Sequence, residues 1–283
     1  MGDLIEGGSW LRHGVVVEDA TVGSGSFVGF RVVLRHATVG EGVQVAARAR
    51  IAGTPEQPVH VGDGAWVGAG AYIAPGVRLG EHSIVGAGAE VYEDVPARTL
   101  SYGRPAFGRS SVATMFDQGD GIEAVLELVR KRPKRDTTRL FPDGPADVNA
   151  FFDCAATLGE DVTIGRGAVM IGRPDGPSPD GGIVVGARAV LGDWLVAEGG
   201  GGLSIGPDVV LGDGVTITTS THDHRVPGRP WTAAPVYLEA GAEIGSGSTI
   251  VGPARIGAGA RVTPGAVVTR SLAPGEISKG VFG

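Results

Sequence analysis

An aliphatic residue recurs at every sixth position through two stretches of the chain, and this spacing constrains the fold more than any other feature. A period of six fits neither an α-helix, with about 3.6 residues per turn, nor a single long strand. It fits a short strand followed by a tight corner, with one inward aliphatic side chain per strand. Three such sides close a coil of about 18 residues, and stacked coils share one apolar column. The two unbroken runs are Val61, Val67, Ile73, Leu79, Val85 and Val91, and then Leu238, Ile244, Ile250, Ile256, Val262 and Val268.

Weaker repeats extend both runs toward the N-terminus. Three stretches break the phase, at 53–60, 172–184 and 219–235, and we expect each to loop outward because the core column cannot absorb it. The 50 glycines among 283 residues suit corners that need unusual backbone angles. The weaker repeats are Val16, Val22 and Val28, then, after a slip of one residue, Val33, Val39, Val45 and Ile51, and in the second half Leu158, Ile164, Met170, Val185, Leu191, Ala197, Ile205, Leu211 and Ile217.

Residues 108–155 lack the repeat and separate the two stretches. Apolar residues recur on one face of the segment 120–132, which predicts an amphipathic helix ending before Pro133. We interpret the basic run 130–135 as a solvated helix end in preference to a patch for an anionic partner. The chain is therefore predicted to be an all-β solenoid protein, two parallel β-helices joined by a short α-helical linker, with domains at 1–107 and 156–283 and the linker at 108–155.

Composition limits the classes of function. The net charge of −7 argues against a general nucleic-acid surface. The single cysteine, Cys154, excludes an internal disulfide and a CxxC metal site. Without a signal peptide or a run of about 18 apolar residues, we expect a cytoplasmic protein with no membrane span. The bias of the basic residues toward arginine favours a bacterial source.

Two segments resemble known enzymes. Residues 65–106, AWVGAGAYIAPGVRLGEHSIVGAGAEVYEDVPARTLSYGRPA, resemble the C-terminal half of bacterial nucleotide-sugar acetyltransferases. Residues 189–283, with STHDHRVPGRPW followed by PVYLEAGAEIGSGSTIVGPARIGAGARVTPGAVVTRSLAPGE, resemble the maltose/galactoside and colanic-acid O-acetyltransferases. Both groups belong to the hexapeptide-repeat acyltransferase superfamily. The resemblance implies left-handed coils, a homotrimer with active sites between subunits, and acetyl-CoA or another acyl-CoA lying along the outside of the β-helix.

Acyl transfer from a thioester needs a base, an oxyanion donor and a channel for the pantetheine arm. Of six histidines, only His222 and His224 lie in a long insertion. Relatives place their catalytic histidine at the start of this loop in a T-H or H-D context, so the resemblance assigns the general base to His222. It leaves Asp223 or His224 to orient that base or to touch the acceptor, and Trp231 to contact the acceptor.

Two further catalytic candidates follow from the resemblance. Relatives carry an aspartate seven residues before the position of Ile205, where this chain has Glu198 followed by four glycines. Whether Glu198 acts on the acceptor or is a surface carboxylate stays open at this point. For the oxyanion, relatives use a backbone amide in an I-G-S context, which corresponds to Ser246.

The donor side is expected along VTPGAVVTR, residues 262–270. Relatives end this motif in a basic residue that meets a CoA phosphate, and Arg270 keeps it. Pro264 has no N–H to donate, so the pose of the donor changes if relatives use that amide. We add Gly252 and Lys279 to the donor-binding residues and expect no metal.

The first stretch shows the reverse pattern. It has Glu93 where relatives place a cation, it lacks the long loop, and its His36 is one residue out of phase with the catalytic histidine of sugar N-acetyltransferases. We interpret His36 as an outward polar residue, and the first β-helix as a scaffold or a degenerate copy.

The leading hypothesis is an acyltransferase that acts on a hydroxyl or amine of a small polar acceptor, such as a sugar or a specialised metabolite. One alternative is a non-catalytic scaffold in which both solenoids only assemble. Another is a zinc enzyme like the γ-carbonic anhydrases, which share the fold and need three converging histidines. The fold does not identify the acceptor, the acyl group or its carrier.

Overall fold

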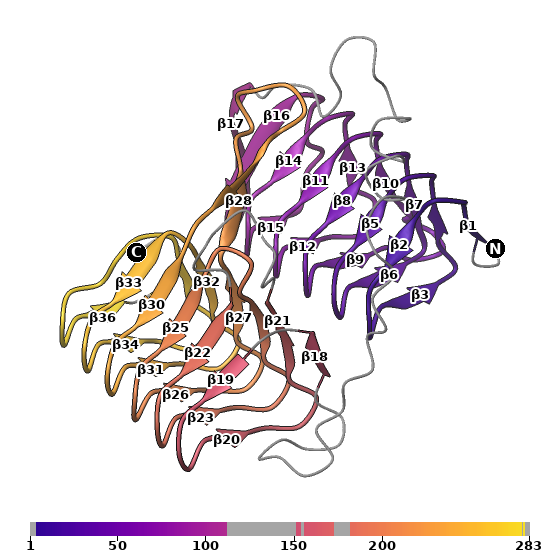
Figure 1. The fold of residues 1–283 in the computed structure, drawn as a ribbon. Helices are drawn as coiled ribbons and strands as arrows, with labels where there is room; N and C mark the ends of the chain where they lie inside the picture. Colours follow the sequence, from indigo (N-terminus) through magenta and orange to yellow (C-terminus); the bar gives the residue numbers. More distant parts are fainter. Residues whose placement is uncertain (1–3, 112–150, 154–155, 173–181, 279, 281–283) are drawn as a thin grey trace. The chain divides into compact units, whose positions relative to one another are not determined.

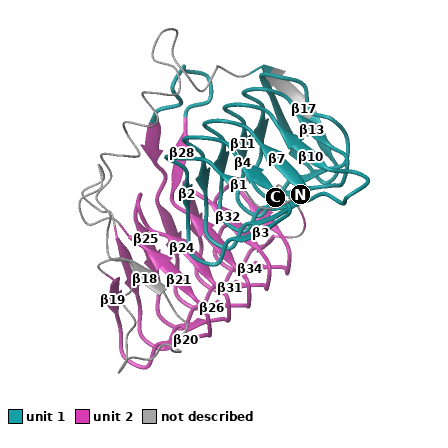
Figure 2. Ribbon diagram, turned by 90° about the vertical axis from the view of Figure 1, so that its right-hand side faces the viewer, with its two compact units in different colours: residues 1–134, 223–230 teal, residues 135–222, 231–283 magenta. Residues whose placement is uncertain are grey.

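The computed structural model describes residues 4–111, 151–153, 156–172, 182–278 and 280 (Figure 1). Within these ranges all regular structure is β, and there is no helix that could cross a membrane. The predicted helix at 120–132, Cys154 and Lys279 lie outside the described residues. The chain forms two compact units: unit 1 contains residues 1–134 and 223–230, and unit 2 contains residues 135–222 and 231–283 (Figure 2).

Unit 1 is built from three sheets. Sheet 1A contains β1 (Leu4–Ile5), β4 (Thr21–Val22), β7 (Ala37–Val39), β10 (Val59–Val61) and β13 (Arg78–Leu79). Sheet 1B contains β2 (Trp10–Leu11), β5 (Phe27–Val28), β8 (Gln44–Val45), β11 (Trp66–Val67), β14 (Ile84–Val85), β16 (Thr99–Gly103) and β17 (Ala106–Ser111). Sheet 1C contains β3 (Val16–Glu18), β6 (Val33–Arg35), β9 (Arg50–Ala52), β12 (Tyr72–Ile73) and β15 (Glu90–Val91).

Unit 2 repeats this plan. Sheet 2A contains β18 (Phe151–Asp153), β21 (Val169–Ile171), β24 (Val196–Glu198), β27 (Thr216–Thr218), β32 (Thr249–Val251) and β35 (Val267–Val268). Sheet 2B contains β19 (Ala156–Leu158), β22 (Ile183–Val185), β25 (Leu203–Ile205), β30 (Val236–Leu238) and β33 (Ala254–Ile256). Sheet 2C contains β20 (Thr163–Ile164), β23 (Val190–Leu191), β26 (Val210–Leu211), β31 (Glu243–Ile244), β34 (Arg261–Val262) and β36 (Ile277–Ser278).

Successive coils stack in parallel register, as Figure 1 shows for both units. Along the regular coils a strand pairs with the strand three places further along the chain, as β4 does with β7 and β20 with β23, so three strands make one coil. The hairpin β28–β29 interrupts this count, so that β27 pairs with β32. Val61 lies opposite Leu79 in unit 1, and Ile244 lies opposite Val262 in unit 2. Both offsets equal three hexapeptides. The predicted β-solenoid of stacked parallel strands is therefore confirmed.

The inward positions of both unbroken repeats form the cores. All twelve aliphatic residues of these repeats are at most 4% exposed, and they belong to one apolar cluster in each unit. The longer inward series of the second half is also buried from Ile164 onward, and Leu158 packs partly buried against it. Full burial of a residue such as Ile217 stabilises the fold by about 1.5–3 kcal/mol.

The predicted position of the phase slip is wrong. Leu34 is fully buried in the first core, whereas its neighbour Val33 is partly exposed. Likewise Val16 is 44% exposed, and Val17 is the residue of β3 that packs against the core. Val16 and Val33 are therefore not inward residues. The inward series has short steps from Val17 to Val22 and from Leu34 to Val39, in place of the single step predicted from Val28 to Val33.

Two unusual residues explain the short corners. Asp19 and His36 follow β3 and β6, and their φ angles of 49° and 42° lie in the left-handed region. Asp and His adopt this region more readily than most residues, and here it turns the chain within a corner that is one residue shorter. His36 is out of phase because it occupies such a corner.

The insertions leave the coils between consecutive strands. Residues 53–58 separate β9 from β10, and Thr54 and Gln57 close this loop by exchanging two backbone hydrogen bonds of 3.1 Å. Residues 173–181, between β21 and β22, lie outside the described ranges. The insertion after β27 forms the hairpin of β28 (Ser220–His222) and β29 (Trp231–Ala233).

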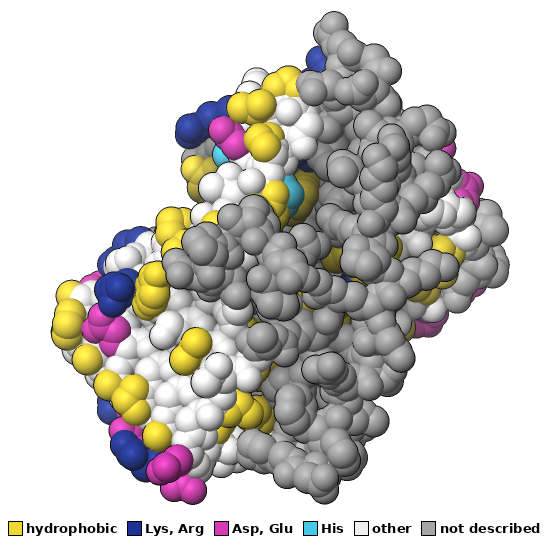
Figure 3. All heavy atoms as spheres, viewed as in Figure 1, with side chains coloured by type: hydrophobic (Ala, Val, Ile, Leu, Met, Phe, Trp, Pro, Cys, Tyr) yellow, Lys and Arg dark blue, Asp and Glu magenta, His cyan; other side chains and the backbone are white. Residues whose placement is uncertain are grey.

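Exposed ion pairs also join neighbouring coils. Basic and acidic side chains lie side by side on the face seen in Figure 3. Solvent screens such exposed pairs, so each adds little to the stability that comes from the apolar column. The pairs of unit 2 include Arg188–Asp208 at 2.7 Å, Arg255–Glu239 at 2.7 Å and Arg261–Glu243 at 3.0 Å.

Strand β26 offers a matched test of this architecture. Leu211 is 1% exposed and points into the core, while Val210 beside it is 42% exposed. We expect Leu211→Ala to lower the free energy of unfolding by about 2–5 kcal/mol, because it leaves a cavity in the column. Val210→Ala should change it by less than about 1 kcal/mol. Urea denaturation measures both, and equal effects would contradict the inward assignment.

Candidate active site

The hairpin β28–β29 carries the predicted general base. In its antiparallel register His222 lies directly opposite Trp231, so the two side chains project from the same face of the hairpin. Both are partly exposed, as is His224, whereas Asp223 is exposed. The Asp223 carboxylate accepts a hydrogen bond of 3.0 Å from the backbone N–H of Arg225. It thus caps the turn at the hairpin tip.

The base of the hairpin is tied to the coil that carries Glu198. Thr219 is fully buried and donates its hydroxyl to the carbonyl of Glu198 at 2.7 Å. The same hydroxyl accepts a bond of 2.9 Å from the N–H of Gly201, and the Thr219 carbonyl accepts one of 2.7 Å from Ala234. These three contacts fix where the hairpin leaves the solenoid and bring Glu198 to its base.

The glycines after Glu198 permit a close approach of backbones. A Cβ on Gly201 would overlap the carbonyl oxygen of Thr219, so no larger residue fits there. Gly252, on the following coil, meets the carbonyl of Ala234 in the same way. Gly200 differs, because a Cβ there would lie 3.9 Å from the Trp231 ring, an ordinary contact distance.

Gly252 and Arg270 continue the same edge of the solenoid. Glu198 is the last residue of β24, and Gly252 and Arg270 follow β32 and β35 of the same sheet. The order of sheet 2A puts the hairpin between Glu198 and Gly252. Arg270 is half-exposed and donates to the carboxylate of Glu276 at 2.7 Å. This guanidinium, together with the N–H of Ala273, lowers the pKa of Glu276. We call this edge, from Glu198 to Arg270, the hairpin edge.

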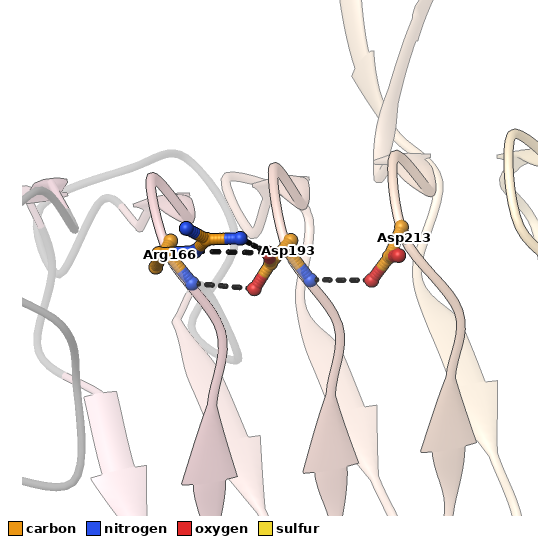
Figure 4. Close-up of polar contacts among 3 residues, drawn as sticks. All are labelled: Arg166, Asp193 and Asp213. Atoms are coloured by element: carbon orange, nitrogen blue, oxygen red, sulfur yellow. Dashed lines mark hydrogen bonds and ion pairs between the residues drawn. The ribbon is translucent and has the colours of Figure 1, made fainter.

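Ser246 lies at the opposite end of the sheet 2A strands, on a second edge of unit 2. This edge has its own polar ladder, of which Figure 4 shows Arg166, Asp193 and Asp213. The carboxylate of Asp193 accepts from the backbone N–H of Arg166 at 2.8 Å and from its guanidinium at 3.0 Å. One coil further, the N–H of Asp193 donates to Asp213 at 2.8 Å, and the N–H of Asp213 donates to the Ser246 hydroxyl at 3.1 Å. The bonds from Arg166 lower the pKa of Asp193.

Pro264 ends this ladder. Pro264 lies against Gly245, in the coil that follows Ser246. Its side chain has no oxygen that could accept a hydrogen bond from the N–H of Ser246. The N–H of exposed Ser246 accordingly has no acceptor among the described residues. A backbone N–H that faces solvent at a corner is a suitable donor to an oxyanion.

Within one chain, the predicted residues therefore lie on two different edges of unit 2. His222, Trp231, Glu198, Gly252 and Arg270 share the hairpin edge. Ser246 and Pro264 lie on the other. The ladder of Arg166, Asp193 and Asp213 was not predicted from the sequence, although the repeated L-G-D at 191–193 and 211–213 is its signal.

In unit 1 the residues that correspond to the base and to the phosphate-binding cation are His36 and Glu93. The imidazole of His36 is 21% exposed and lies 3.7 Å from the carboxylate of Asp19 on the preceding coil. The carbonyl of His36 accepts the N–H of Val59 at 3.0 Å. Glu93 is exposed. Over the described residues of the whole chain, no three His, Cys, Asp or Glu side chains gather as a metal site.

Comparison with known families gives a match over β10 to β15. Residues 58–93 match the family described as bacterial transferase hexapeptide (six repeats). Residues 58–93 therefore carry hexapeptide repeats of the bacterial transferase type, and the resemblance to the hexapeptide-repeat acyltransferase superfamily is confirmed at that level.

Individual relatives cover only parts of the chain. The galactoside O-acetyltransferase of Lactococcus lactis is 32% identical over 69 residues, which are 23% of this chain and 33% of that enzyme. A protein of Schizosaccharomyces pombe, described as a candidate acetyltransferase, is 47% identical over 49 residues, 17% of this chain and 24% of its own. The chain thus spans between a quarter and a third of the length of these curated relatives.

Solved structures match in the same partial way. The apoenzyme of soybean serine acetyltransferase has a TM-score of 0.30 and 34% identity, over 32% of this chain and 40% of that one. A mutant of perosamine N-acetyltransferase from Caulobacter crescentus, in complex with CoA and GDP-perosamine, has a TM-score of 0.32 and 25% identity, over 38% and 54%.

The glycine run provides a direct test of the hairpin base. We expect Gly201→Ala to lower the free energy of unfolding by about 1–3 kcal/mol, because the added methyl group collides with the Thr219 carbonyl and the backbone must shift. Its neighbour Gly200→Ala is the matched control and should be tolerated. Urea denaturation measures the stability of both variants. Equal effects of the two substitutions would rule out this close approach.

Proposed function

We propose that unit 2 catalyses transfer of an acetyl or other short acyl group from a CoA-type thioester to a hydroxyl or amine of a small polar acceptor. The observation that carries this proposal is the hairpin β28–β29. It is an insertion in a regular solenoid, it presents His222 opposite Trp231, and buried hydrogen bonds fix its base beside Glu198. A solenoid that only assembled would not require such an arrangement.

The reaction assigns one role to each group. His222 takes the proton of the acceptor hydroxyl or amine, whose heteroatom attacks the thioester carbonyl carbon. The N–H of Ser246 stabilises the resulting oxyanion. When the tetrahedral intermediate collapses, the carbon–sulfur bond breaks, and the leaving CoA thiolate receives the proton from the His222 imidazolium. The acyl group has then moved from the thiol to the acceptor, and the proton of the acceptor has moved to the thiol.

Glu198 and Trp231 form the acceptor side of the proposed site. The backbone of Glu198 is held at the hairpin base by the bond from Thr219 to its carbonyl, and we propose that its carboxylate serves the acceptor there. A carboxylate and an indole ring together suit a polar acceptor with an apolar face, such as a sugar or an aminated metabolite. His224 and Asp223 lie beyond the base, where Asp223 shapes the turn.

The donor is proposed to lie along the hairpin edge, past Gly252 to Arg270. Arg270 would bind a CoA phosphate, in competition with the carboxylate of Glu276. Lys279 remains a further candidate for phosphate binding. We propose one such donor site per chain, in unit 2, because unit 1 places Glu93 at the corresponding position.

The two edges favour a homotrimer. Ser246 and the hairpin are at opposite ends of the sheet 2A strands, so one chain does not bring the oxyanion donor to its own base. A neighbouring copy in a closed ring could supply the missing edge. We therefore propose that each active site combines the hairpin of one subunit with the Ser246 corner of the next.

The base is tested by substitution of His222. We expect His222→Ala to lower kcat by about 10²–10⁴-fold, the usual contribution of a general base, with unchanged thermal stability. His224→Ala is the matched control in the same loop and should cost less. Steady-state release of thiol from acetyl-CoA measures both. If His224→Ala were the inactive variant, the base would have been assigned two residues too early.

The phosphate contact is tested with a modified donor. We expect Arg270→Ala to raise the KM for acetyl-CoA by about tenfold, and to leave the KM for acetyl-dephospho-CoA, which lacks the 3′-phosphate, unchanged. Glu276→Gln should lower the KM for acetyl-CoA, because it releases the guanidinium from its carboxylate. An equal effect of Arg270→Ala on both donors would remove Arg270 from phosphate binding.

A further inference from the structure

Trp194 occupies a corner position at which the neighbouring coils of unit 2 have glycine. It follows β23, and its φ angle of 62° lies in the left-handed region, which a bulky side chain rarely adopts. Its N–H donates to the carbonyl of Arg166 on the preceding coil at 2.7 Å, and the same bond recurs down the corner. The equivalent residues of the other coils are Gly167, Gly214, Gly247 and Gly265, with φ angles from 62° to 71°.

The side chain of Trp194 projects away from the solenoid. A Cβ on Gly247 or on Gly265 would meet no atom within 4 Å, so this position of the corner faces open space. Trp194 is accordingly 45% exposed. The core at this corner is filled by Leu195, which is fully buried, so the apolar column does not require the indole. Backbone strain at a side chain that the core does not need points to a function of that side chain.

Trp194 lies on the same edge of unit 2 as Ser246. It follows Asp193, from which the ladder runs through Asp213 to Ser246. The Asp193 carboxylate is paired with the guanidinium of Arg166 at 3.0 Å (Figure 4), whereas Asp213 is exposed and accepts the N–H of Asp193. Two coil spacings, roughly 10 Å, separate the level of Trp194 from that of Ser246. An indole, a carboxylate and the proposed oxyanion donor thus follow one another along this edge.

Trp194 lies at the level of the proposed acceptor group and not at that of the donor groups. Strand β24 begins shortly after Trp194 and ends at Glu198, which is proposed to serve the acceptor. The proposed donor contacts, Gly252 and Arg270, follow β32 and β35. In the order of sheet 2A these two strands lie beyond β27, on the side away from β24. Both edges therefore carry their acceptor features on the coil of β24.

We propose that Trp194 is an acceptor-binding residue, and that its indole stacks on a ring of the acceptor. Asp213 accepts a hydrogen bond from a hydroxyl or ammonium group on the rim of that ring. An indole presents a broad apolar face, which a ring covers better than a linear chain does. The acceptor class is then a cyclic compound with hydroxyl or amino groups. This inference rests on the function proposed above, and one arm of its test measures binding without acyl transfer.

The kinetic arm compares three substitutions of Trp194 in the 283-residue chain. Trp194→Phe keeps a ring, whereas Trp194→Ala and Trp194→Gly remove it. With acetyl-CoA as donor, we expect kcat/KM for glucosamine to fall by about tenfold in both ring-free variants and by less than about threefold in Trp194→Phe. The KM for acetyl-CoA should stay unchanged. Ethanolamine, an acceptor without a ring, should react equally well with all variants.

The stability of the same variants separates the ring from the backbone. Trp194→Gly should unfold about 2–4 °C above Trp194→Ala, because glycine adopts the left-handed angle without strain. If the role of Trp194 were merely structural, acceptor kinetics would follow this difference and the glycine variant would be the more active. Asp161→Gly is the matched control, since Asp161 has a φ angle of 57° at the corner between β19 and β20, away from the ladder. It should leave acceptor kinetics unchanged.

The binding arm measures glucosamine and methyl β-galactoside by calorimetry in the presence of CoA, which has no acyl group to transfer. We expect Trp194→Gly to weaken binding about tenfold relative to wild type. Equal binding by the two proteins overturns the stacking, as does a wild type that binds neither compound. Acceptor kinetics unchanged in both ring-free variants overturn it as well. If the wild type bound glucosamine through Trp194 but transferred no acyl group, the proposed function would fail and the ring-binding site would stand.

Discussion

The structure depends on the in-register stacking of short parallel strands around an apolar column. Because every coil lies directly on the next, a residue in one coil restricts which residue types fit at the same position of the adjacent coils. An aliphatic side chain must recur at each inward position, as Ile217 and Ile250 do on adjacent strands of sheet 2A. Where two backbones approach most closely, as at Gly201, only glycine fits. The same stacking lines up corner groups into columns, so a polar side chain such as Asp193 can bind the backbone of the coil before it.

Function enters where this regularity is interrupted. The hairpin leaves the solenoid because sheet 2A and sheet 2B cannot absorb its residues, and buried Thr219 sets its direction. On the other edge the interruption is chemical: Pro264 lacks the oxygen that would continue the ladder, and the N–H of Ser246 is left facing solvent. In unit 1 the guanidinium of Arg229 donates hydrogen bonds to the backbone carbonyls of Gly64 and His82. All three features are departures from the repeat, and each gives the scaffold a group with a possible chemical task.

The repeat was predictable from the sequence, because one inward aliphatic residue per strand is a local rule. The slip was misplaced since Val16–Val17 and Val33–Leu34 are adjacent aliphatic pairs, and either member satisfies the pattern. The corner angles at Asp19 and His36 decide between them, and angles have no clear signature in side-chain hydropathy. The hairpin and its histidines were predictable as an insertion. The hydrogen bonds of Arg229 were not, because its partners are backbone carbonyls, which every residue possesses.

The central claim is that the hairpin of unit 2 serves acyl transfer from a CoA thioester. Release of free thiol from acetyl-CoA by the 283-residue chain tests it most directly. The release is followed with a chromogenic thiol reagent across a panel of sugars, amino sugars and small amines. The account predicts release that depends on a particular acceptor and rises well above the acceptor-free rate. Release that stays at the acceptor-free rate throughout the panel, with longer acyl-CoAs as well as acetyl-CoA, would contradict it and favour a scaffold.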